Sequence, residues 1–215
     1  MRMLNTSDMK PAATAGIILA AGMSVRFEST KQLAGFNSKP LVLHAAENAL
    51  NSRLHRVVLV LGHESDKVMD AVRPLLNHER FEVIVNSGFR GGMGESLSMG
   101  VRHVMNQYPS VMVLLGDMPL IDAGIINYLL NRFENAGCDI CVPAHQGRNG
   151  HPVIFNASCY PELIKLTGDT GGREIIRSRS GGVLFVDMEN ASVLTDIDTP
   201  RDLADITAST LHHKP

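Results

Sequence analysis

The stretch GIILAAGMSVRFESTKQL, residues 16–33, joins a short apolar run to a loop that carries two cations. Residues 16–19 are apolar without interruption, which predicts a buried β-strand. The residues that follow show neither helical nor alternating periodicity: two alanines and a glycine come first, then Arg26 and Lys31. Small residues let a ligand approach the backbone closely, and cations neutralise phosphate. This loop is therefore a candidate site for a phosphate chain.

The composition is that of an ordinary globular protein. The chain has 215 residues, of which 44% are hydrophobic and 20% charged, and its formal net charge is −2. This length suits one α/β domain with a full core. The chain has no tryptophan, few aromatic residues and no basic excess, which argues against nucleic acid as a partner. Cations that bind an anionic ligand must therefore be concentrated locally.

The opening residues, the apolar runs and the number of cysteines indicate the cellular compartment of the protein. The opening residues, MRMLNTSDMKPAATAG, lack the apolar core of a secretory signal. No run approaches the about 18 apolar residues that a membrane span needs, so we expect no membrane association. Three cysteines are too few for a disulfide scaffold. We expect a cytoplasmic protein with a domain over residues 15–208, a flexible segment over 1–14 and a flexible tail over 209–215.

Apolar runs of strand length alternate with helix-like segments along the chain. The predicted strands are residues 17–20, 57–61, 83–85, 111–115, 140–142, 153–155 and 183–186. Helical spacing predicts two apolar helix faces, one formed by Val68, Val72, Leu75 and Leu76, the other by Ile121, Ile125, Leu129 and Phe133. This alternation predicts a single α/β domain with a doubly wound, mostly parallel sheet.

Four segments directly follow predicted strands: residues 20–31, 86–96, 116–119 and 144–152. In open α/β sheets, ligands bind beyond the carboxyl ends of the strands. Binding and catalytic residues are therefore expected in these segments.

The segment GDMP, residues 116–119, places a carboxylate at the end of an apolar strand. A carboxylate there is costly unless something pairs with it. Mg²⁺ prefers one or two carboxylates together with substrate phosphates, a role that suits Asp117. The alternative is that Asp117 caps a helix whose first residue is Pro119.

The segment TDIDTPRD, residues 195–202, has two interpretations that can both hold. Thr199 or Asp198 would cap the last helix, with Pro200 in its first turn. Asp196 or Asp198 would supply a second carboxylate to the same metal ion.

Three further segments combine glycine with polar residues or cysteine. NSGFRGGMGES, residues 86–96, carries four glycines, and its Gly92 and Ser96 would line a nucleotide base; a mobile loop without function is the alternative. His151 would contact a ligand or hydrogen-bond its own turn, and the turn GDTGGR, residues 168–173, is a possible second anion site. The pair Cys138 and Cys141 has no second CxxC, so we interpret both as structural core residues.

Taken together, these segments resemble the molybdopterin nucleotidyltransferases. The motifs, in chain order, are LAAGMSVRF, Lys31, Lys39-Pro40-Leu41, GGMGESL, GDMP, GRNGHPVIF, GDTGGRE and DIDTPRD, and they extend from Gly16 to about Ile206. GMGESL, GHPVIF and GDTGGRE are similar to the molybdenum cofactor cytidylyltransferase branch. The guanylyltransferase branch has a glycine pair where this chain has Ala20 and Ala21, which favours CTP over GTP. The chain departs from the first motif at Glu28, where glycine is usual.

The resemblance implies a Rossmann-like nucleotidyltransferase fold and a Mg²⁺-dependent transfer of CMP from CTP to the terminal phosphate of molybdopterin, with release of pyrophosphate. Arg26 and Lys31 would hold the triphosphate and act as the catalytic cations. Asp117 and Asp198 would bind the metal. Residues assigned to the nucleotide are Leu19, Ala20, Ala21, Gly22, Ser24, Gly92, Ser96 and Asp117. Residues assigned to the acceptor are His151, Gly172 and Arg173.

Three other functions compete with this one. The first is a nucleotidyltransferase acting on another phosphorylated acceptor, such as a sugar phosphate. The second is a chaperone that carries the molybdenum cofactor to a molybdenum hydroxylase apoenzyme. The third is an oxidoreductase, which the absence of a G-x-G-x-x-G fingerprint disfavours.

Overall fold

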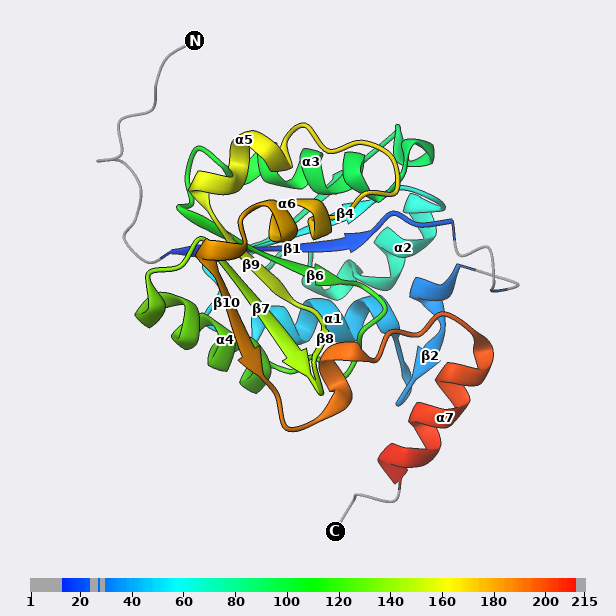
Figure 1. The fold of residues 1–215 in the computed structure, drawn as a ribbon. Helices are drawn as coiled ribbons and strands as arrows, with labels where there is room; N and C mark the ends of the chain where they lie inside the picture. The colour runs from blue at the N-terminus through cyan, green and yellow to red at the C-terminus, as the bar shows by residue number, and fades with distance from the viewer. Residues whose placement is uncertain (1–12, 24–26, 28–29, 212–215) are drawn as a thin grey trace.

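The computed structural model describes residues 13–23, 27 and 30–211. Figure 1 shows a central twisted sheet with helices on both faces. Among the described residues, the main sheet has eight strands in the order β10-β7-β9-β6-β1-β4-β5, with β8 paired to β7. The strands are β1 Thr14–Ala20, β4 Arg56–Leu61, β5 Phe81–Val85, β6 Ser110–Leu115, β7 Ile140–His145, β8 Arg148–Asn149, β9 Val153–Asn156 and β10 Val183–Asp187. All seven strands predicted from the apolar runs are confirmed.

The directions of the strands decide which residues meet at one edge of the sheet. Strand β1 is parallel to β4 and β6, β4 is parallel to β5, and β7 is parallel to β10. Strand β9 runs antiparallel to both β6 and β7, and β8 antiparallel to β7. The mostly parallel sheet is therefore confirmed. Because β9 is reversed, the residues that precede it lie at the edge of the sheet where its neighbours β6 and β7 end.

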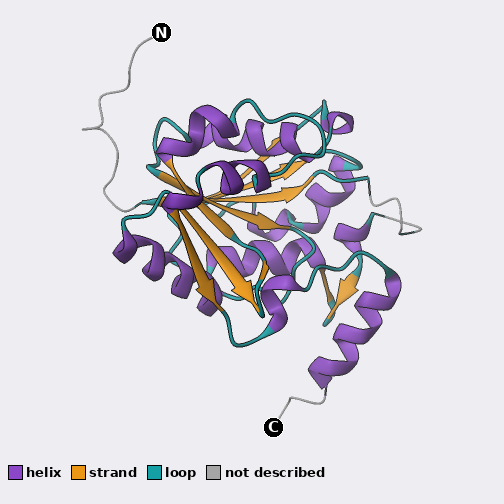
Figure 2. Cartoon of the chain, viewed as in Figure 1, coloured by secondary structure: helices purple, strands orange, loops and turns teal. Residues whose placement is uncertain are grey.

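Seven α-helices are described: α1 Leu41–Leu50, α2 Ser65–Ala71, α3 Met93–Val104, α4 Ala123–Ala136, α5 Tyr160–Leu163, α6 Arg173–Ser178 and α7 Pro200–Leu211. Figure 2 shows helices on both sides of the sheet. One face of the sheet buries side chains against α1, α2 and α4, and the other against α3, α5 and α6. In β1, Ile18 belongs to the first core and Ile17 to the second. Covering both faces in this way explains the continuous apolar runs. None of the described helices is long and apolar enough to cross a membrane.

Both predicted helix faces extend beyond the helices that form. Helix α2 ends at Ala71, and a short 3₁₀ helix over Arg73–Leu75 follows. Pro74 explains the end, because proline lacks an amide donor and disfavours helical geometry in the residue before it. Helix α4 begins at Ala123, and the Asp122 side chain caps it by accepting from the Ile125 amide. The predictions that Pro119 begins a helix and that Asp117 could cap it are therefore wrong.

A smaller layer carries the C-terminal part of the chain. Strands β2 (Gly35–Phe36) and β3 (Lys39–Pro40) form a separate antiparallel pair. Phe36 and Leu41 are buried there together with Ile197 and Ile206, which come from the segment before α7 and from α7 itself. This third core holds the residues around Asp198 close to the segment after β1.

Two glycine-rich motifs far apart in the sequence pack directly against each other. Gly92 precedes α3 with a φ of 98°, in the left-handed region. A Cβ at Gly92 would lie 2.2 Å from the carbonyl carbon of Gly168. The Gly94 amide also donates to the Gly168 carbonyl oxygen at 2.8 Å. GMGESL and GDTGGRE are therefore two halves of one structural unit.

This contact predicts that Gly92→Ala destabilises the protein by about 2–4 kcal/mol, because it combines a strained φ with a clash against backbone atoms. Gly181→Ala is the matched control, since no atom lies within 4 Å of the position of its added Cβ. Urea denaturation of both variants measures the difference. Equal midpoints for the two variants would show that the Gly92–Gly168 contact is not a constraint.

Candidate active site

The candidate site lies at the edge of the sheet where β1 and β6 end. Asp117 follows β6 by two residues, and the Gly116 amide donates to the Leu19 carbonyl of β1 at 3.0 Å. The Ile197 amide donates to the Asp117 carbonyl oxygen at 3.1 Å. The end of β6 is therefore tied both to β1 and to the segment that precedes α7.

Lys31 connects three distant parts of the chain at this edge. Its Nζ lies 2.5 Å from Asp117 Oδ2 and 2.9 Å from Asp198 Oδ1. The side chains of Lys31 and Asp117 are only 16% and 14% exposed, whereas that of Asp198 is 34% exposed. We call these three residues the Lys31 cluster. The structure thus brings together one predicted phosphate-binding cation and both predicted metal ligands.

The charges within the Lys31 cluster depend on one another. Burial by itself would lower the pKa of Lys31, but the charges and hydrogen bonds of Asp117 and Asp198 outweigh it, so this pKa is raised. Burial raises the pKa of Asp117, and the negative charge of Asp196 adds to the effect, while Lys31 opposes it. Lys31 therefore stays charged and makes an ionised Asp117 less costly.

Asp198 is held in place by the start of α7. The Asp202 carboxylate accepts from the amides of Asp198 at 3.0 Å and Thr199 at 2.7 Å. In return the Thr199 hydroxyl accepts from the Asp202 amide at 3.2 Å, which completes a reciprocal cap. Thr199 is therefore the residue that caps α7, which was one of the two predictions. The Asp198 side chain contacts Lys31 instead.

The loop after β1 is described only in part. Ala20 and Ala21 are buried, Leu19 is half-buried and Gly22 is exposed. Arg26 and Ser24 lie outside the described residues, so their predicted contacts with phosphate and nucleotide remain predictions.

His63, which the sequence analysis did not consider, lies beside this loop. It follows β4, and its amide donates to the Ala21 carbonyl at 3.3 Å. Its ring contacts Phe89 edge-on, and its Nδ1 is buried with no hydrogen-bond partner among the described residues. The sequence did offer one signal for His63: it comes two residues after a predicted strand, where ligand-binding residues are expected.

Ser96 forms a hydrogen bond within the protein, and its predicted contact with a nucleotide base remains a prediction. It is 3% exposed inside α3, and its hydroxyl accepts from the Asn86 side-chain amide at 3.0 Å. Asn86 also accepts from the Gly88 amide at 2.9 Å. These bonds hold the turn that leads to Gly92. Asn86 was missed, although Asn directly before Ser-Gly after a strand is a turn signal.

Two of the predicted acceptor residues, His151 and Arg173, lie near enough to interact electrostatically. The His151 amide donates to the Val193 carbonyl at 2.8 Å, beside the end of β6. Burial lowers the pKa of His151, the positive charge of Arg173 adds to this, and the charge of Asp196 opposes it. Because Asp196 acts electrostatically on both His151 and Asp117, these residues share one charged region.

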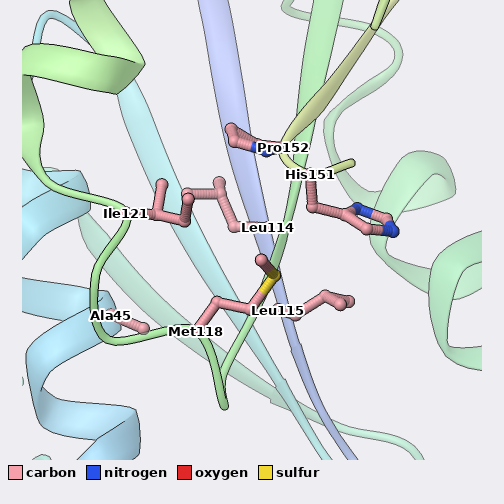
Figure 3. Close-up of a pocket in the computed structure, with 7 residues that line it drawn as sticks. All are labelled: Ala45, Leu114, Leu115, Met118, Ile121, His151 and Pro152. Carbon is pink, nitrogen blue, oxygen red and sulfur yellow. The ribbon is translucent and has the colours of Figure 1, made fainter. Parts of the chain in front are cut away.

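Figure 3 shows the apolar surface next to His151, in a small pocket whose lining includes Leu114, Met118 and Ile121. The imidazole points away from these three side chains. The chain after Asp117 therefore packs into the core, and His151 is directed away from it.

Gly172 has a packing reason to be glycine. A Cβ there would lie 2.5 Å from Cζ of Phe155, in β9. Arg173 is exposed at the start of α6. The proximity of Arg173 to His151 keeps the predicted acceptor group together, but the contact of either residue with an acceptor remains a prediction.

The donor set at the cluster suits a divalent cation that also binds phosphate. Among the described residues, no group of three or more His, Cys, Asp or Glu side chains could hold a metal ion. Asp117 and Asp198 supply two carboxylates, and Asp117 Oδ1 is buried without a hydrogen-bond partner in the described part of the chain. Two carboxylates completed by substrate phosphates are what Mg²⁺ prefers.

The three cysteines are unpaired by disulfides. Cys138, Cys141 and Cys159 are free thiols. Burial raises the pKa of each thiol, to about 12 for Cys141, which disfavours the reactive thiolate.

Comparison with known proteins connects this geometry to a family. The model of the MobA-like NTP transferase domain matches residues 16–183. Nicotine blue oxidoreductase of Paenarthrobacter nicotinovorans is 30% identical over 86% of this chain and 91% of its own length. A probable molybdenum cofactor guanylyltransferase of Thermococcus sibiricus is 31% identical over 70% of this chain and 71% of its own. Molybdenum cofactor cytidylyltransferase of Escherichia coli is 27% identical over 86% and 91%.

Solved structures show the same fold. A homologue of Mycobacterium tuberculosis Rv0371c from Mycobacterium sp. strain JC1 has a TM-score of 0.80 and 25% identity, covering 94% of this chain and 99% of its own. Rv0371c of M. tuberculosis itself, solved in complex with manganese, has a TM-score of 0.73 and 24% identity over 92% and 99%. Since the relatives include both cytidylyl- and guanylyltransferases, likeness alone does not select a nucleotide.

The lowered pKa of His151 predicts a pH dependence of stability. The unfolded chain binds a proton at this histidine near pH 6.5, whereas the folded chain binds it only at lower pH. Stability from this group is therefore present above about pH 6.5 and is lost as the pH falls toward the folded pKa. Between pH values of about 7.5 and 5.5, the wild type should lose more unfolding free energy than His151→Gln.

Denaturant titrations of both proteins across this pH range provide the measurement. The comparison with His151→Gln removes the contribution of the other histidines. Parallel curves for the two proteins would mean that His151 titrates alike in the folded and unfolded chains.

Proposed function

Because this chain belongs to the MobA-like NTP transferase family, we propose that it transfers CMP from CTP to the terminal phosphate of molybdopterin. Membership makes it a nucleotidyltransferase; the nucleotide and the acceptor are the proposal. The observation that carries it is the Lys31 cluster, a charged lysine between two carboxylates beyond the ends of parallel strands. A nucleoside triphosphate and a divalent cation need this combination of groups.

The proposed reaction requires little chemistry from protein side chains. An anionic oxygen of the acceptor phosphate attacks the α-phosphorus of CTP, and a new phosphoanhydride bond forms. The bond from the α-phosphorus to the oxygen that bridges to the β-phosphate breaks, and pyrophosphate leaves with the electron pair. Since the attacking oxygen already carries a negative charge, no general base is required. Catalysis is then positioning and charge stabilisation.

Lys31 is the described residue best placed to stabilise this charge. Its ammonium lies at the carboxyl edge of β1 and β6, and its pKa is raised, so it is positively charged at neutral pH. In the proposal it contacts the phosphates, together with Arg26 from the preceding loop. These cations counter the charge that develops on the α-phosphoryl group and on pyrophosphate.

Asp117 and Asp198 would hold Mg²⁺. Their carboxylates are hard oxygen donors, and Asp117 Oδ1 has no hydrogen-bond partner among the described residues. When bound, Mg²⁺ supplies Lewis-acid polarisation of a phosphoryl oxygen and neutralises negative charge. Asp117 is fixed by the end of β6 and Asp198 by the cap of α7, so both are positioned before substrate arrives.

The choice of CTP and molybdopterin has separate support. Ala20 and Ala21 stand where the guanylyltransferase branch has a glycine pair, and the motifs GHPVIF and GDTGGRE are similar to those of the cytidylyltransferase branch. Arg173 acts electrostatically on His151, so a cationic residue lies near the histidine that would bind the acceptor. In this proposal a molybdenum hydroxylase apoenzyme would receive the product.

A pyrophosphate-release assay with Mg²⁺ tests the proposal. CTP, GTP, ATP and UTP are each assayed with molybdopterin, with a sugar phosphate and without acceptor. We expect release with CTP and molybdopterin only, and without any partner protein. Release with a different nucleotide or acceptor would replace the proposed substrates. Tight CTP binding without release under any condition would favour the chaperone function.

A substitution at Lys31 tests its assigned role. Lys31→Gln should lower kcat by about 100-fold or more, because it removes the charge that stabilises the transferred phosphoryl group. Lys39→Gln is the matched control, since Lys39 pairs with Glu47 at 2.7 Å on the surface. Steady-state kinetics and thermal melts of both variants separate rate from stability. An unchanged kcat in Lys31→Gln would remove Lys31 from the reaction.

A further inference from the structure

The Lys31 cluster places an ammonium where the proposed function needs a metal ion. Lys31 Nζ contacts both Asp117 and Asp198, at 2.5 and 2.9 Å. These are the two carboxylates that would bind Mg²⁺. Two cations cannot both fill the space between the same two carboxylates without strong repulsion.

The two carboxylates are fixed, whereas the lysine can move. The Asp117 backbone is tied to Ile197, and the Asp198 amide is bonded to Asp202 in the cap of α7. Lys31 begins a 3₁₀ helix of three residues, and its charge sits at the end of a flexible four-carbon side chain. The ammonium can therefore leave while the carboxylates stay in place.

The cost of that movement depends on the nucleotide. The Lys31 side chain is 16% exposed, so a metal ion arriving alone would displace a poorly hydrated ammonium from both of its carboxylate partners. The metal would gain only two carboxylates, because the described residues offer no group of three ligating side chains. Nucleotide phosphates make the exchange of ammonium for metal more favourable in two ways. They give Lys31 new anionic partners, and they give the metal further oxygen ligands.

We propose that Lys31 occupies the cation position between Asp117 and Asp198 until nucleotide phosphates draw its ammonium away, so that metal binding requires bound nucleotide. This inference rests on the proposed function for the identity of the metal ligands. It adds a second role for Lys31: the residue that stabilises the phosphates also prevents metal from binding first. The free enzyme is thereby protected from holding a divalent cation in an unproductive site.

Direct titration with Mn²⁺ alone tests the inference without turnover. Mn²⁺ is followed by electron paramagnetic resonance, which reports the free ion, with wild type, Lys31→Gln and Lys39→Gln. We expect Lys31→Gln to bind one Mn²⁺ at least tenfold more tightly than wild type, and Lys39→Gln to match wild type. The gain should disappear in a Lys31→Gln, Asp117→Asn double variant, which locates the new site at the cluster.

Equal Mn²⁺ affinities in wild type and Lys31→Gln, or no binding to either, would overturn the inference. A further experiment on wild type alone does not depend on how a variant folds. In this experiment a non-reactive α,β-methylene analogue of CTP is added to wild type and Mn²⁺. The amount of bound Mn²⁺ should then be at least tenfold higher than the amount that the analogue binds by itself. Retention that is already complete without the analogue would also overturn the inference.

Failure of the proposed function would look different. If the substrate assay identifies another nucleotide or acceptor while Lys31→Gln still gains Mn²⁺ affinity, the inference stands and only the substrates change. If CTP and molybdopterin are confirmed but Lys31→Gln gains no affinity, the function stands and Lys31 does not control metal binding.

Discussion

The ion pairs of Lys31 with Asp117 and Asp198 are the interaction on which the arrangement of the site depends. Asp117 is largely buried, and burial raises its pKa, so its ionised form needs a nearby positive charge. Lys31 supplies that charge from the segment after β1, and Asp198 shares it from the segment before α7. One ammonium thus connects three parts of the chain that are distant in sequence.

The fold brings these parts together through strand direction. Parallel strands β1 and β6 end at the same edge, which places the Lys31 segment beside Asp117. The reversed strand β9 starts at that edge, so His151 comes to the opposite side of Asp117. The contact of Gly92 with Gly168 joins the motif before α3 to the loop before α6. Because β6 lies between β9 and β1, the segment of Lys31 and the segment of His151 lie on either side of the end of β6.

Much of the fold could be predicted because buried strands are continuous apolar runs. The ends of the helices were harder to predict, although both depend on local signals. Pro74 explains why α2 ends before the predicted apolar face does, and the Asp122 cap explains why α4 begins later than its predicted face. Asp117 was a candidate from the sequence because it directly follows a strand, whereas Asp198 lies in the segment before α7. The direct pairing of Lys31 with both carboxylates could not be predicted from the sequence, because the proximity of these residues depends on strand order and on the docking of α7. His63 was missed because a lone histidine carries no motif.

A crystal structure with Mn²⁺ and the α,β-methylene analogue of CTP would show whether a metal ion replaces the Lys31 ammonium between the two carboxylates. Anomalous scattering locates the manganese, and the electron density shows the partner of Lys31. We predict manganese bound by Asp117 and Asp198 and by phosphate oxygens, with the Lys31 ammonium moved onto the phosphates. Manganese and nucleotide bound elsewhere, with Lys31 still between the two carboxylates, would contradict it.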